Sequence, residues 1–106
     1  MTTFNDYRTK TGSSVEKFFK ATLHESPSLM LGLNCLEPGQ TQSVHAHGGQ
    51  DKFYFVVEGE GDFVVGDEQQ RCGPGFTVWA PAGIDHGVSN AGAARLVVLV
   101  GIAPWK

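Results

Sequence analysis

Residues 39–59 read GQTQSVHAHGGQDKFYFVVEG, and this stretch decides the fold of the chain. A glycine stands at each end, the pair His45 and His47 lies in the middle, and the hydrophobic run FYFVV follows at 53–57. Side chains alternate along a strand, so both histidines point to one face if the segment is extended. Two imidazoles on one face can converge on a metal ion, but for an isolated His-x-His a chance surface pair is the better explanation. The meaning of the pair therefore depends on the rest of the chain.

Turn residues divide the rest of the chain into short pieces. The 14 glycines and 5 prolines gather in EPGQ, HGGQ, EGEG, VGDE, CGPG, PAGI and NAGA. The pieces between them are rich in Val, Phe, Leu, Thr and Tyr, which suit strands. This spacing is typical of an all-β sandwich or barrel. We predict strands near 16–23, 28–36, 41–47, 52–58, 61–65, 68–72, 76–80, 86–90 and 95–102.

A second pattern lies at residues 75–90, GFTVWAPAGIDHGVSN, with a glycine, a PAG turn, His86 and Asn90 at fixed spacing. Together the two patterns resemble the two signature motifs of the cupin family. The second is matched at every fixed position, and the first at every position except its glutamate. The motifs and the strands between them cover about residues 32–91. The resemblance implies a cupin fold, which is a double-stranded β-helix or jelly-roll barrel.

The resemblance also implies that His45, His47 and His86 meet inside the barrel, with His86 across the barrel from the other two. Three imidazoles with open coordination positions suit Fe, Mn, Ni, Cu or Zn. We therefore predict a site for a divalent metal ion. The residues do not identify the metal, because imidazole suits several ions.

The glutamate that the first motif lacks would be separated from Gly59 by six residues, at the position where this chain has Lys52. An ammonium group cannot bind a metal ion and repels one. Three interpretations stay open. The histidines bind metal without a carboxylate while Lys52 turns aside or holds an anionic ligand; a bulge at Gly48-Gly49 brings Gln50 or Asp51 to the metal; or the histidines bind an organic ligand without metal.

The wall of a ligand pocket is mostly apolar, so large side chains on the expected strands are its candidates. These are Met30, Tyr54, Phe63, Phe76 and Trp79. No Ser-His-Asp order or nucleophile elbow is present, so catalytic residues are not assigned. The histidines favour a metal-dependent small-molecule enzyme, such as a dioxygenase or isomerase. The absent glutamate favours a cupin that binds a small ligand without catalysis, and a dimeric module with no chemistry is a third alternative.

Length and charge limit the organisation of the chain and its partners. The 106 residues suit one domain, with a polar, flexible arm at 1–14 and a barrel at 15–106. A formal charge of −3 without a basic cluster argues against nucleic acid and membrane partners. We see no signal peptide and no apolar run long enough to span a bilayer, so we expect a cytoplasmic protein.

Two hydrophobic segments and two cysteines complete the sequence-based expectations. Residues 53–57 and 96–102 are apolar on both faces, whereas a strand with one wet face alternates. Either N-terminal residues or a second subunit covers the outer face, and we predict a homodimer. Cys35 and Cys72 are far apart in sequence and are expected to be buried thiols rather than a disulfide.

Overall fold

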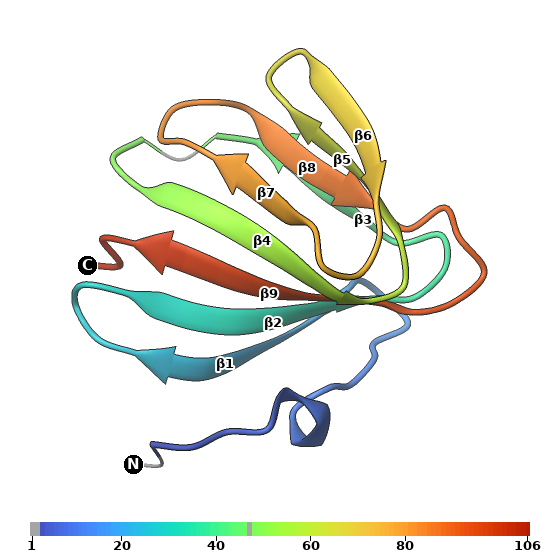
Figure 1. Ribbon diagram of the computed structural model, residues 1–106, viewed down its shortest axis with the longest axis horizontal. Helices are drawn as coiled ribbons and strands as arrows, with labels where there is room; N and C mark the ends of the chain where they lie inside the picture. Colours follow the sequence, from blue (N-terminus) through green and yellow to red (C-terminus); the bar gives the residue numbers. More distant parts are fainter. Residues whose placement is uncertain (1–2, 47) are drawn as a thin grey trace.

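The computed structural model describes residues 3–46 and 48–106, and it confirms the predicted all-β jelly-roll class. One sheet has the strand order β1-β2-β9-β4-β7, and the other has the order β3-β8-β5-β6. The two sheets are joined by loops and face each other (Figure 1). The strands of the described residues are β1 (Phe19–Glu25), β2 (Met30–Leu36), β3 (Thr41–His45), β4 (Asp51–Glu58), β5 (Gly61–Val65), β6 (Glu68–Cys72), β7 (Thr77–Ala80), β8 (His86–Ser89) and β9 (Leu96–Ala103).

The core lies between the sheets and follows from strand alternation. Along β4, the side chains of Lys52, Tyr54 and Val56 are buried, while the residues between them are only half-buried. β9 pairs with β4 and places Val98 and Val100 beside Val56 and Tyr54. These residues belong to one cluster that also contains Leu36, Phe63, Cys72, Val88, Leu96 and Ile102. Burying this apolar surface is the main favourable contribution to folding.

A second, smaller cluster covers part of the outer face of the five-stranded sheet. Leu33, Cys35 and Val97 are almost fully buried there, and Tyr7 packs against them. Tyr7 belongs to a short 3-10 helix, η1 (Tyr7–Thr9). N-terminal residues therefore account for part of the two-sided hydrophobicity of β4 and β9. The homodimer stays a prediction.

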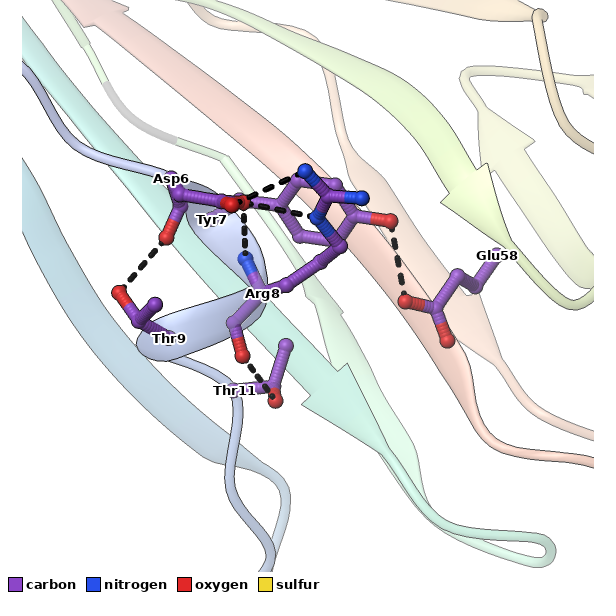
Figure 2. Close-up of polar contacts among 6 residues, drawn as sticks. All are labelled: Asp6, Tyr7, Arg8, Thr9, Thr11 and Glu58. Carbon is purple, nitrogen blue, oxygen red and sulfur yellow. Dashed lines mark hydrogen bonds and ion pairs between the residues drawn. The ribbon is translucent and has the colours of Figure 1, made fainter.

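Polar contacts hold η1 in place (Figure 2). The Tyr7 hydroxyl donates a hydrogen bond to the Glu58 carboxylate at 3.0 Å. Asp6 accepts from the backbone N–H of Arg8 at 3.1 Å, and its carboxylate pairs with the Arg8 guanidinium at 2.9 Å. Both Cys35 and Cys72 are buried and free, as expected from the sequence.

Gly59, the glycine that closes the first motif, meets a steric requirement. Its φ is +75°, a conformation that favours glycine. A Cβ at this position would also clash with the carbonyl oxygen of Arg95. The turn between β4 and β5 thus depends on this glycine. Within the described part of the chain, no helix has the length and apolarity needed to cross a membrane.

Candidate metal and ligand site

His45 and His86 are brought side by side by strand pairing. His45 ends β3, His86 begins β8, and the two residues are Cα partners in the antiparallel ladder. Their ring centroids lie 4.7 Å apart, with the ring planes at 53°. His86 therefore lies on the strand adjacent to His45, so the expectation that it lies across the barrel is wrong. The reason is that β3 and β8 are neighbours in the same sheet.

The PAG turn places His86 at the start of β8. The backbone N–H of Ile84 donates to the carbonyl of Pro81 at 3.2 Å, and Gly83 has a φ of +79°. The chain then enters β8 directly. On the other strand, the register shifts between Gln42 and His45, which marks a bulge. Bulges re-aim side chains at the rims of barrels, and this one precedes the first histidine.

Backbone carbonyl groups select the same tautomer in both rings. Nδ1 of His45 lies 2.7 Å from the carbonyl oxygen of Ser43, and Nδ1 of His86 lies 3.0 Å from that of Ile84. A carbonyl can only accept a hydrogen bond, so Nδ1 carries a proton, and in the neutral ring the lone pair is then on Nε2. Metal-binding histidines in proteins are held by this kind of bond to the other ring nitrogen. Both rings are thus in a state suited to ligation through Nε2.

His47, the third expected ligand, lies outside the described residues. Within residues 3–46 and 48–106, no group of three His, Cys, Asp or Glu side chains is placed to hold a metal ion. The three-histidine site therefore stays a prediction. The structure places His45 and His86 side by side, and His47 is included from the sequence motif alone.

Lys52, at the position of the missing glutamate, points into the barrel. It pairs with Ala80 on β7 and Ile102 on β9, and only 5% of its surface is exposed. Its Nζ lies 4.8 Å from the centroid of the Tyr54 ring. It forms no ion pair or hydrogen bond with any residue that the structure describes. Burial, and secondly the charge of Lys20, lower the pKa of Lys52 to about 8.

Gln50 and Asp51 make other contacts. The side-chain amide of Gln50 donates to the carbonyl groups of Pro104 and Trp105, at 3.0 and 3.2 Å. The Asp51 carboxylate accepts from the backbone N–H of Ala82 at 2.9 Å and so ties the start of β4 to the PAG turn. These bonds anchor the entrance of the barrel, and neither joins the side chain to a histidine.

A cavity of about 450 Å³ adjoins His45 at this end of the barrel. The start of β4 and the end of β9 lie at this end, on the left in Figure 1. His45 and Lys52 line the cavity with Lys20, Asn34, Gln42 and Met30. None of the described lining residues is acidic. The volume is that of a site for a small molecule.

Tyr54 lies beneath the cavity and joins its polar groups. It is fully buried, and its hydroxyl donates to Oε1 of Gln42 at 2.7 Å. Its ring centroid is 6.3 Å from that of His86, in an edge-on arrangement. Burial raises the pKa of its phenol, so the hydroxyl keeps its proton and serves as a hydrogen-bond donor.

The predicted pocket residues separate into two places. Met30 lines the cavity beside His45, and Tyr54 contacts the histidine and lysine groups. Phe63 packs on Tyr54 with ring centroids 5.3 Å apart, and it also lines a second cavity of about 370 Å³ with Phe76 and Trp79. Phe76 and Trp79 do not line the histidine cavity. They belong to the region of β7, an edge strand, and the Trp79 side chain is 58% exposed.

Polar residues of the cavity that the sequence did not single out are Lys20, Asn34, Gln42 and Ser43. Asn34 carries a usable signal, because it interrupts an otherwise hydrophobic strand and is only 5% exposed. Lys20 carries none, because a lysine in a strand usually faces solvent.

Two packed antiparallel sheets with histidines at one end of the barrel define a protein of the double-stranded β-helix class. The family model for the cupin domain matches residues 32–101, so the chain belongs to the cupin family.

Solved structures agree with this assignment, and one curated relative has a similar sequence. The TT1209 protein from Thermus thermophilus is 39% identical, with 95% of this chain and 96% of that chain covered and a TM-score of 0.92. An RmlC-like cupin protein from Desulfovibrio desulfuricans is 30% identical, with 98% and 97% covered and a TM-score of 0.82. An uncharacterized protein of Methanocaldococcus jannaschii is 24% identical over 93 residues, which are 88% of this chain and 74% of that protein.

Proposed function

We propose that this cupin binds a divalent metal ion through His45, His47 and His86 and uses it to bind and transform a small molecule in the adjoining cavity. The observation that carries the proposal is the pair of neighbouring imidazoles with Nδ1 bonded to backbone carbonyls. Each ring presents Nε2 as the ligating atom, and the cavity begins beside His45.

The distance between the rings supports a shared ion. A metal lies about 2.0–2.1 Å from an imidazole nitrogen, so it lies about 3.2 Å from the ring centroid. Two rings bound to one ion at about 90–110° then have centroids about 4.5–5.2 Å apart. The centroids of His45 and His86 are 4.7 Å apart.

The chemistry follows from the donor set. A divalent ion held by neutral imidazoles keeps its full charge and would act as a Lewis acid and template for a ligand. The protein's own groups supply orientation: Tyr54 holds Gln42 through its hydroxyl, and the apolar side chains of Met30 and Val100 exclude water from one wall of the cavity. Oxygen-dependent oxidation of a small molecule is the activity that we propose to test first.

The activity is tested by oxygen consumption of the iron-loaded protein with a panel of 1,3-diketones, thiols and catechols. We expect consumption with at least one class and its loss in His86→Ala. A protein that binds metal but is silent across the panel would favour the alternative of a non-catalytic ligand-binding cupin. That alternative is supported by the lack of an acidic side chain among the described lining residues, since a carboxylate is a common general acid or base.

A further inference from the structure

Lys52 is a buried ammonium group with no ion-pair or hydrogen-bond partner among the described residues. Only 5% of its surface is exposed, yet no described residue offers it an acidic partner or a hydrogen-bond acceptor. Its one contact of note is the face of the Tyr54 ring. A buried charge without a partner is costly, and such groups in proteins are normally paired. The amine lines the cavity of about 450 Å³, so the cavity is where its partner would enter.

The charge of the cavity points to the kind of partner. Lys20 lines the same cavity and is close enough to oppose the charge of Lys52. The described lining residues provide two amines, His45 and the amide side chains of Asn34, Gln42 and Gln50, with no carboxylate among them. The Oε1 atom of Gln42 accepts from Tyr54, so this amide has N–H donors to offer a ligand. This arrangement complements an anion.

The apolar part of the wall distinguishes an organic anion from an inorganic one. Met30, Val100, Ile102 and Phe18 line the cavity together with the two amines. A carbon skeleton would cover these side chains, whereas a phosphate or sulfate ion would leave them facing water. A lysine ammonium is a compact point charge that suits a single carboxylate.

We propose that Lys52 and Lys20 form a carboxylate-binding subsite, and that the ligand of this protein is a small organic acid with its carboxylate on Lys52 and its other end towards the histidines. The second half of this statement rests on the proposed metal site, whereas the subsite itself does not. The position where the family pattern has an acidic metal ligand thereby becomes a contact for an acidic ligand.

The test compares small carboxylates with their uncharged amides: benzoate with benzamide, hexanoate with hexanamide, and succinate with succinamide. Binding to the whole chain is measured by calorimetry at pH 7, once with metal-free protein and once with zinc-loaded protein. We expect at least one carboxylate to bind at least about tenfold more tightly than its amide, because a charge-assisted contact replaces a neutral one. The preference should disappear in Lys52→Met and fall severalfold in Lys20→Met. Lys17→Met, which removes an exposed lysine outside the cavity, should leave it unchanged.

The outcomes separate this inference from the proposed function. A Lys52-dependent preference in protein that takes up none of iron, zinc, manganese, nickel and copper would support the subsite and overturn the metal site. Zinc binding with no preference for any carboxylate would overturn the subsite and leave the metal site in place. Inorganic phosphate binding as tightly as the best carboxylate would overturn the organic-acid class. If Lys52→Met does not fold, the difference in affinity of the wild-type protein between each carboxylate and its amide tests the subsite alone.

Discussion

Replacing Lys52 by methionine should stabilise the metal-free protein, and the gain should shrink as the pH rises. The pKa of Lys52 falls from 10.5 to about 8 on folding because the amine is buried and faces Lys20. Folding therefore disfavours the protonated form. The cost is fully present below pH 8 and disappears as the pH rises through 10.5, where the unfolded chain also loses the proton. Methionine fills a similar volume without a charge.

The magnitude follows from the two pKa values. A fall in pKa from 10.5 to about 8 corresponds to about 3 kcal/mol in the free energy of unfolding at about pH 6.5. At about pH 9.5 the folded protein has already released the proton, and the remaining cost is about 1 kcal/mol. The packing difference between methionine and neutral lysine does not vary with pH. The gap in unfolding free energy between Lys52→Met and wild type should thus narrow by about 2 kcal/mol between these pH values.

Urea unfolding followed by tryptophan fluorescence at about pH 6.5 and about pH 9.5 measures this gap. The comparison cancels other groups that titrate in the window, such as the buried thiols of Cys35 and Cys72, whose pKa burial raises. Lys17→Met serves as the exposed control, and its gap should stay constant. A gap for Lys52→Met that is constant or widens with pH would refute the reasoning that Lys52 is a buried, unpaired ammonium.

The remaining predictions concern the metal site, a turn and the assembly. Lys52→Glu should bind zinc at least about tenfold more tightly than Lys52→Gln in a competition titration, since a carboxylate adds a ligand; equal affinities would place position 52 away from the metal. Gly59→Ala should lower the free energy of unfolding by more than about 2 kcal/mol, because alanine disfavours positive φ and its Cβ meets Arg95. Gly48→Ala, where a Cβ meets nothing within 4 Å, should cost far less in the same urea titration. Light scattering at micromolar concentration should give the mass of a dimer, and the mass of one chain would remove the homodimer.

Most of the fold was predictable because turn residues mark the ends of its strands. The expected strands at 61–65 and 68–72 coincide with β5 and β6. The first strand begins at Phe19, three residues later than expected from 16–23, because no glycine or proline marks its start. Strand boundaries can be predicted where glycine, proline or other turn residues flank the strand, and they are predicted less accurately where such residues are absent.

The sequence predicted which histidines belong to the candidate site, but not how the strands that carry them pair. The motifs identified His45 and His86, yet their direct pairing depends on the β3–β8 register and its bulge, which no local pattern encodes. Hydrophobicity alone also does not reveal which face of a strand a side chain occupies. Trp79 therefore qualified as a residue of the histidine pocket, although it lies on an edge strand and lines the second cavity instead. Lys20 was missed because it is exposed, like most lysines in strands, and its contribution to the cavity lining leaves no signal in the sequence.

The metal content of the protein tests the central claim most directly. Tag-free protein purified without chelator would be analysed by elemental mass spectrometry, beside His47→Ala and His86→Ala. The account predicts close to one divalent metal ion per chain in the wild type and its loss in both variants. A wild-type protein that holds no metal, even after incubation with iron, zinc, manganese, nickel and copper followed by desalting, would contradict it.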